Sequence, residues 1–186
     1  MKLATWNVNS IRAREERLLR WLGAHQPDVL CLQELKVTDD LFPMLPIRSL
    51  GYHAAVHGQK TYNGVAILSL EEPAEIERGF GDGGDEAHAR LVAARVGGVR
   101  VASVYVPNGQ EVGSEKYGYK LGWLARLKDY VAAALENNER FAIVGDYNIA
   151  PEDRDVHDPA KWEGSVHVSP AEREALAGLL GTGLVD

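Results

Sequence analysis

Residues 91–106 read LVAARVGGVRVASVYV, and this stretch does most to decide the fold. Two runs rich in valine and alanine lie on either side of Gly97-Gly98. A glycine pair adopts the positive φ angles of a two-residue turn at little steric cost, and β-branched residues favour extended backbone. The stretch therefore predicts a hairpin of two antiparallel strands.

A second hairpin and several isolated strands are predicted outside this stretch. YHAAVHG (52–58) and GVAILSL (64–70) are apolar runs joined by the polar loop QKTYN, which is typical of a hairpin. KLATWNV (2–8), VLCLQE (29–34) and FAIVG (141–145) also have strand composition.

Helical periodicity marks three other segments. Residues 11–25 place Ile11, Leu18, Leu19 and Leu22 on one face, with Asn9 or Ser10 as the cap and Pro27-Asp28 as the stop. Residues 119–137 repeat leucine and valine at helical spacing, and residues 170–181 form a short helix capped by Ser169.

Strand–helix–strand segments thus alternate with tight hairpins. This mixture favours an α/β sandwich over a purely parallel, doubly wound sheet. The chain has no repeat of fixed period and no linker of biased composition, so we expect one domain over residues 1–186.

Composition limits the class of protein. The 186 residues are 45% apolar and 25% charged, which is ordinary for a globular protein. The net charge of −7 argues against binding nucleic acid through bulk positive charge. Cys31 is the sole cysteine, and neither a signal peptide nor a membrane-spanning stretch is recognisable, so we expect a cytoplasmic location and no membrane association.

Polar side chains follow three of the predicted strands. Asn7 and Asn9 end the first, Gln33 and Glu34 the second, and Asp146 and Asn148 the last. Side chains at strand ends converge in layered α/β folds. Two carboxylates with amides are hard oxygen ligands that suit Mg²⁺ or Mn²⁺, and an aspartate beside a metal-activated water can take its proton. The alternative is a set of Asx turns and helix caps.

Other catalytic patterns are missing from the sequence. It contains no G-x-S-x-G elbow, H-E-x-x-H motif, cysteine pair for zinc or Walker-type phosphate loop. The acidic loop from Asp153 departs from a calcium loop, because Asp158 stands at its sixth position and Gly164 at its twelfth. We interpret His157 and His167 as solvated loop histidines.

The order of several motifs resembles a known family. TWNVNSIRA, PDVLCLQELK, YNGVAIL, VYVPNGQ and GDYNIAPEDRDV are similar to the exodeoxyribonuclease III/AP endonuclease family, which belongs to the endonuclease/exonuclease/phosphatase (DNase I-like) superfamily. KYGYKLGWL and RDVHDP resemble the exonuclease III branch in particular. The resemblance extends over the whole chain and implies a four-layered α/β sandwich, also classed as α+β, with two mixed β-sheets flanked by helices.

The resemblance also implies roles for individual residues. Asn7 and Glu34 match metal-site positions, Tyr105 matches the tyrosine that contacts the scissile phosphate, and Asp146 and Asn148 match the acid and the amide that activate and orient the attacking water. Arg12 and Lys36 are expected to contact DNA phosphates.

The implied activity is Mg²⁺-dependent (or Mn²⁺-dependent) hydrolysis of double-stranded DNA at abasic sites and 3′ ends, by a monomer with no obligate protein partner. The family continues into an aromatic-rich loop, an R-I-D motif and a terminal S-D-H motif, which the 186 residues do not contain. We therefore expect a domain incomplete at its C-terminus, lacking its last strands. A catalytically impaired fragment that only binds DNA or metal, and a phosphoesterase for small phosphate esters, stay open as alternatives.

Overall fold

The structure is a computed structural model that describes residues 1–84, 88–137 and 140–186. The chain divides into two compact units, and each is described here by itself. Unit 1 consists of Met1–Tyr105 and Arg140–Asp146, and unit 2 of Val106–Glu139 and Tyr147–Asp186. The expectation of one domain over residues 1–186 stays a prediction.

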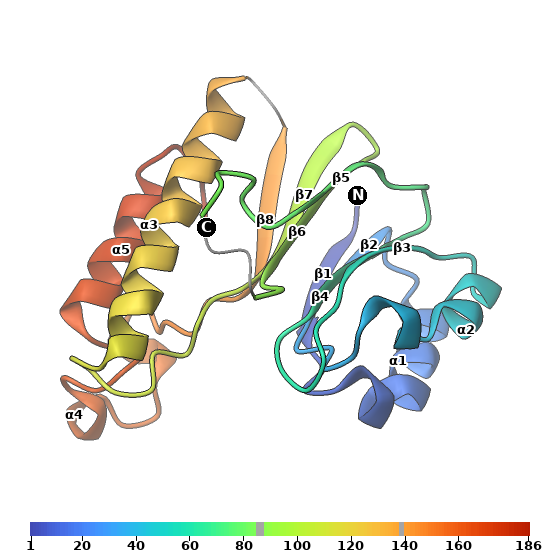
Figure 1. Cartoon of the computed structure of the whole chain (residues 1–186). Helices are drawn as coiled ribbons and strands as arrows, with labels where there is room; N and C mark the ends of the chain where they lie inside the picture. The colour runs from blue at the N-terminus through green and yellow to red at the C-terminus, as the bar shows by residue number, and fades with distance from the viewer. Residues whose placement is uncertain (85–87, 138–139) are drawn as a thin grey trace. The chain divides into compact units, whose positions relative to one another are not determined.

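Unit 1 contains two mixed β-sheets (Figure 1). The first has the order β1-β2-β4-β3, with β1 (Leu3–Asn7), β2 (Val29–Gln33), β4 (Val65–Ser69) and β3 (His53–His57). The second has the order β5-β6-β7-β8, with β5 (Ala74–Arg78), β6 (Leu91–Val96), β7 (Val99–Tyr105) and β8 (Phe141–Asp146). The pairs β1–β2 and β7–β8 are parallel and the other pairs are antiparallel.

Both predicted hairpins are confirmed. β6 pairs with β7 from Leu91 opposite Val104 to Val96 opposite Val99, and β3 pairs in the same antiparallel sense with β4. Strand β5 was not predicted, because three of its five residues are charged and glutamate is uncommon in strands. All five residues are exposed.

The alternation of side chains along β2 explains how this strand is buried on both faces. Leu30 and Leu32 belong to the core that also contains α1 (Ile11–His25) and α2 (Met44–Ser49), whereas Val29 and Cys31 belong to the core between the two sheets. Successive residues of a strand point to opposite faces, so one short strand serves two cores. Unit 1 thus has a helical layer, a sheet and a second sheet.

Helix α1 has the predicted bounds. The Ser10 side chain accepts a hydrogen bond from the Ala13 amide at its start, and Gln26 ends it in a left-handed conformation. Of the four residues predicted on its apolar face, Ile11, Leu18 and Leu22 are buried and Leu19 is partly buried against the same core. A short 3₁₀ turn, η1 (Asp39–Leu41), precedes α2.

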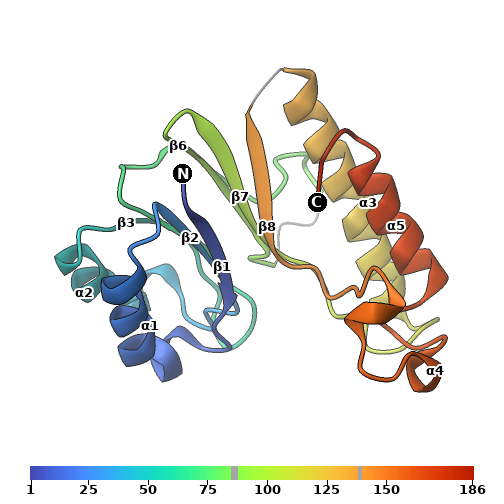
Figure 2. The same cartoon turned by 180° about the vertical axis from the view of Figure 1, so that it is seen from behind.

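Unit 2 is mainly helical. It contains α3 (Glu115–Glu136), the 3₁₀ turn η2 (Asp153–Asp155), α4 (Pro159–Trp162) and α5 (Pro170–Leu180). Helices α3 and α5 lie side by side in both views (Figures 1 and 2). The predicted start of α3 at Tyr119 was wrong by one turn, because Ser114 caps the helix through the Tyr117 amide ahead of the leucine-rich repeat.

None of the helices in the described ranges is both long and apolar enough to cross a lipid bilayer.

Candidate active site

The ends of two parallel strand pairs carry the predicted site residues of unit 1. Asn7 ends β1 and is paired with Gln33 at the end of β2, directly before Glu34. Tyr105 ends β7 opposite Asp146, the last residue of β8. Parallel strands bring their carboxyl ends to one edge of a sheet, so each sheet presents two neighbouring positions there.

The segment after β2 is held in an uncommon backbone conformation. Glu34 and Lys36 have φ angles of 55° and 56°, which residues other than glycine seldom adopt. Two main-chain hydrogen bonds fix them, from the Leu35 amide to the Gly64 carbonyl at 3.1 Å and from the Lys36 amide to the Asn63 carbonyl at 3.0 Å. Such conformations concentrate at functional sites, where the surrounding structure sustains them.

Asn7 joins the two carboxylates. Its Nδ2 donates to Glu34 Oε1 at 2.8 Å and to Asp146 Oδ2 at 2.8 Å. Its Oδ1 accepts from the Asn9 amide at 3.0 Å, so both ends of the side-chain amide have a partner of the right kind. One neutral donor thus separates two acids that would otherwise repel each other.

Lys36 places a positive charge on the same carboxylate. Its Nζ lies 3.0 Å from Glu34 Oε2 and also donates to Asn9 Oδ1. Burial raises the pKa of Glu34, but hydrogen bonds from Asn7 and Lys36, the Lys36 charge and a hydrogen bond from Tyr105 outweigh it, so the net pKa is lowered. Glu34 is therefore an anion at neutral pH.

The pKa of Tyr105 is shifted in the opposite direction to that of Glu34, and its side chain is uncharged. Burial, together with the charge of Glu34 and the hydrogen bond to it, raises the pKa of Tyr105 to about 12. Its phenol is therefore neutral at physiological pH, and the phenol O–H is the donor in the hydrogen bond with the Glu34 carboxylate. The Arg90 guanidinium lies over the ring, 4.9 Å from its centroid, and Arg90 donates to the Tyr105 carbonyl at 3.1 Å. No sequence signal had marked Arg90.

The donor set fits a hard divalent cation. Within the described ranges, no group of three or more histidine, cysteine, aspartate or glutamate residues gathers as a metal cluster. Mg²⁺ needs only one or two carboxylates and keeps several waters. Glu34 and Asp146 supply two carboxylates that are hydrogen-bonded to one amide.

Gln33 at the end of β2 and Arg12 in α1 differ from the residues above in their exposure to solvent. Gln33 is fully buried, and its Nε2 donates to Thr5 Oγ1 at 3.0 Å and to Ser103 Oγ at 3.1 Å, so it belongs to the packing of the two sheets. Arg12 lies exposed in the first turn of α1.

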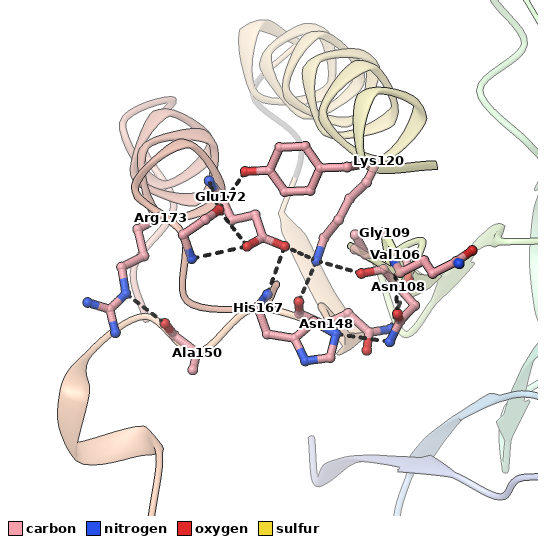
Figure 3. A network of polar contacts seen from close by, with 12 residues as sticks. Val106, Asn108, Gly109, Lys120, Asn148, Ala150, His167, Glu172 and Arg173 are labelled. Atoms are coloured by element: carbon pink, nitrogen blue, oxygen red, sulfur yellow. Dashed lines mark hydrogen bonds and ion pairs between the residues drawn. The ribbon is translucent and has the colours of Figure 1, made fainter. Parts of the chain in front are cut away.

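Asn148 belongs to unit 2, where a buried polar network holds it (Figure 3). Its φ angle is 50°, and its Nδ2 donates to the Val106 carbonyl at 3.0 Å. Its own carbonyl accepts from Lys120 Nζ at 2.6 Å. The network thus fixes both the backbone and the side chain of this residue.

Sequence reasoning missed the buried ion pair of this network, Lys120 with Glu172. A signal existed, because Lys120 stands on the buried face of α3 between Tyr117 and Leu124, at spacings of three and four. A lysine on an apolar face has to find an acidic partner.

The two loop histidines differ from each other. His157 is exposed, as expected for a solvated loop histidine. The same interpretation was wrong for His167, which is partly buried, with its Nε2 2.9 Å from Asn108 Nδ2 and its amide donating to Glu172 at 3.0 Å.

Comparison with known proteins places the chain among nucleases. Exodeoxyribonuclease III of Haemophilus influenzae is 35% identical over 197 aligned residues, which cover 100% of this chain and 74% of the relative. The 3′–5′ exonuclease NExo from Neisseria meningitidis superposes with a TM-score of 0.97 at 42% identity, over 100% of this chain and 73% of NExo.

Two further solved structures extend this comparison. NExo from Neisseria, described as a 3′ phosphatase and bound to a product DNA hairpin, gives a TM-score of 0.97 at 41% identity over 100% of this chain and 72% of that one. An AP endonuclease from Archaeoglobus fulgidus gives a TM-score of 0.95 at 42% identity, with the same coverage of 100% and 72%. These likenesses confirm the predicted α/β class with two mixed β-sheets flanked by helices.

The family model agrees with these relatives. The model of the endonuclease/exonuclease/phosphatase family matches residues 4–182, which include every site residue discussed above. With this match and the full-length similarity to exodeoxyribonuclease III, the chain belongs to the endonuclease/exonuclease/phosphatase family.

Proposed function

We propose that this chain is a Mg²⁺-dependent DNA phosphodiesterase of base-excision repair, with 3′–5′ exodeoxyribonuclease and apurinic/apyrimidinic endonuclease activity. Its assignment as a DNA-repair nuclease rests on relatives named for exodeoxyribonuclease III, 3′–5′ exonuclease and AP endonuclease activities. The observation that carries the mechanism is the pair of carboxylates, Glu34 and Asp146, held 2.8 Å from one amide nitrogen of Asn7.

Duplex DNA with abasic sites or free 3′ ends is the proposed substrate. One relative is described as bound to a product DNA hairpin, which supports a DNA partner. The motifs VYVPNGQ and KYGYKLGWL disfavour a phosphoesterase for small phosphate esters, because they resemble the exonuclease III branch. We propose Lys36 and Arg12 as phosphate contacts, and Lys36 lies 3.0 Å from Glu34, the proposed metal ligand.

Asp146 is the proposed base that takes a proton from the attacking water as the water oxygen bonds to phosphorus. Its Oδ2 accepts a hydrogen bond from Asn7 Nδ2 at 2.8 Å, which fixes the direction of the carboxylate. Tyr105 supplies a neutral phenol, since its pKa of about 12 keeps it protonated, and this O–H can donate to a phosphate oxygen. The scissile P–O bond then breaks, and the departing 3′ oxygen takes a proton from solvent to become a 3′ hydroxyl.

Glu34 is the proposed holder of Mg²⁺, which when bound would polarise a phosphoryl oxygen and offset the developing negative charge. Asn7 is proposed to help by its hydrogen bond to Glu34, because its amide nitrogen and not its oxygen faces this acid. The pKa of Glu34 is lowered, and its ionised form suits this role. Asn148 is the proposed amide that orients the water. Its role rests on the sequence resemblance and on the hydrogen bonds that fix it within unit 2.

The test is cleavage of a duplex with one abasic-site analogue, in Mg²⁺ and in chelator. Asp146→Asn removes the base while keeping the shape, so we expect kcat to fall by about 10²–10⁴-fold with DNA affinity retained. Asp40→Asn, which changes an exposed aspartate of unit 1, is the matched control and should cut like the parent.

Unchanged turnover in Asp146→Asn would refute the role of Asp146, and cleavage that survives chelator would refute the metal requirement. Binding of the abasic duplex with no turnover by the parent chain would favour the alternative of a non-catalytic DNA-binding protein. The expectations of a cytoplasmic location and of a monomer stay predictions.

A further inference from the structure

Lys120 is a fully buried lysine whose ammonium group is completely satisfied. Its Nζ donates to Glu172 Oε1 at 2.5 Å, to the Asn148 carbonyl at 2.6 Å and to the Asn108 carbonyl at 3.2 Å. An ammonium group has three protons to donate, so these three acceptors are enough to satisfy it. These acceptors come from α5 and from two separate loops of unit 2, which converge on the lysine in Figure 3.

Glu172 is the equally buried partner, and its carboxylate is satisfied on both oxygens. Oε1 also accepts from the His167 amide at 3.0 Å, while Oε2 accepts from Ser169 Oγ at 2.6 Å and from the Ser169 amide at 3.2 Å. Burial acts to raise its pKa, but the hydrogen bonds from Lys120, Ser169 and His167 lower it overall. Glu172 therefore carries the charge that neutralises Lys120.

Stability alone gives little reason for such a pair. Removing two charges from water costs about as much as their attraction returns, and apolar residues of similar volume often stabilise a protein equally well. A buried ion pair does fix the positions of its neighbours. Ammonium N–H groups donate and carboxylate oxygens accept hydrogen bonds only within a limited range of angles. The pair is therefore better explained by what it positions.

The position that it controls most closely is the backbone at Asn148. This residue has a φ angle of 50°, and the Lys120 bond fixes its carbonyl while its own side chain donates to Val106. Gly109 is shaped by the same lysine. A Cβ there would lie 3.1 Å from Lys120 Cδ at a φ of 92°, so the loop passes closely over the lysine stem.

We propose that the Lys120–Glu172 pair is a positioning device that fixes the loops at residues 106–109 and 148 and thereby sets the side-chain amide of Asn148 for the reaction. This inference rests on the proposed function, in which Asn148 orients the attacking water. Lys120 and Glu172 are positioning residues, since they act through Asn148.

The variant that tests it is the double substitution Lys120→Met with Glu172→Gln. It removes both charges together, so neither is left buried and unpaired, and the glutamine keeps an oxygen for the Ser169 cap. A loss of positioning by about 1 Å costs on the order of 10²-fold in rate. We expect kcat to fall by about 10–100-fold with KM for the abasic duplex unchanged and the melting temperature within a few degrees of the parent.

Matched controls come from the same two helices. Lys116→Met changes an exposed lysine one turn earlier on α3, and Glu174→Gln changes an exposed glutamate of α5. Their combination makes the same changes of charge and should leave kcat and KM at parent values. A double Lys120/Glu172 variant that keeps the parent kcat would overturn the proposal.

A second readout does not depend on turnover. Amide hydrogen exchange, followed by mass spectrometry on peptides covering residues 106–110 and 147–150, should be at least about tenfold faster in the double variant than in the control. If the parent chain cuts no DNA, the proposed function fails, but unchanged exchange in these peptides is what would defeat the positioning role. A fall in kcat matched by a general rise in exchange over α3 and α5 would mean that the pair only stabilises the fold.

Discussion

At the scale of single residues, the site of unit 1 depends on a neutral side chain between two acids. Asn7 contributes no charge, yet it contacts both Glu34 and Asp146 at 2.8 Å. Its hydrogen bond is one of the causes that lower the pKa of Glu34. The sequence predicted a metal-site position here, and the structure adds that the amide nitrogen faces the acids while the oxygen faces the Asn9 amide.

Asn7→Asp tests this arrangement through its pH dependence. The lowered pKa of Glu34 means that its ionised form stabilises the fold above the ordinary pKa of about 4.3, and that this contribution is lost as pH falls through the folded-state value. An aspartate at position 7 would replace the donated hydrogen bonds to Glu34 and Asp146 by repulsion between negative charges. We expect the variant to be less stable than the parent by about 1–3 kcal/mol at pH 7, with a smaller deficit near pH 4.

Urea denaturation of both proteins from pH 4 to pH 8 measures this difference. Added Mg²⁺ should reduce the deficit at pH 7, because a cation offsets the repulsion among the three acids. A deficit that is the same at both ends of the pH range would mean that charge repulsion is not its cause.

At the scale of elements, β8 holds Asp146 in place through a close contact with β7. A Cβ added to Gly145 would lie 2.0 Å from the Val104 carbonyl oxygen, with the backbone at a φ of 155°. The main chain of a hydrogen-bonded strand cannot move aside to relieve this contact, whereas the end of a flexible side chain could. Glycine at this position therefore lets the two strands run parallel up to Tyr105 and Asp146.

Gly145→Ala should accordingly destabilise the chain by about 2–4 kcal/mol through overpacking and backbone strain, and should reduce cleavage by displacing Asp146. Gly122→Ala is the control, since Gly122 lies inside α3 with no atom within 4 Å of its added Cβ. Alanine there should stabilise by about 0.5–1 kcal/mol. Chemical denaturation compares the two, and equal stabilities would contradict the contact with β7.

At the scale of the whole molecule, a net charge of −7 has to be reconciled with a polyanionic substrate. Binding would then depend on a few local contacts, of which Arg12 on α1 and Lys36 beside Glu34 are the proposed ones. Each lost phosphate contact changes the slope of log affinity against log salt by about 0.9 for duplex DNA.

Arg12→Ala should therefore reduce that slope by about 0.9 and weaken binding to all sequences alike. The measurement is a salt titration of abasic-duplex affinity in the Asp146→Asn background, in which cleavage is expected to be slow on the timescale of the titration. Arg20→Ala, at an exposed position near the other end of α1 and within 3.6 Å of Glu16, is the control. An unchanged slope in Arg12→Ala would remove Arg12 from the DNA contacts.

The sequence by itself determined the family, the fold class and most elements of this protein. Local signals were sufficient there, because Gly97-Gly98 requires a turn and the spacing of Ile11, Leu18 and Leu22 requires a buried helical face. It also marked Asn7, Glu34 and Asp146, since polar residues at the ends of apolar strands can be recognised from the sequence alone, and the resemblance to the family added Tyr105.

Only the tertiary structure decided which of these groups touch and what else holds them. The Asn7–Asp146 contact joins residues 139 positions apart, and the Lys120–Glu172 pair joins positions 52 apart. In both contacts, the residues next to one partner in the sequence give no information about which residue the other partner is. The partners are set by the pairing register of the strands and by the packing of α3 on α5, which depend on the burial of many side chains at once.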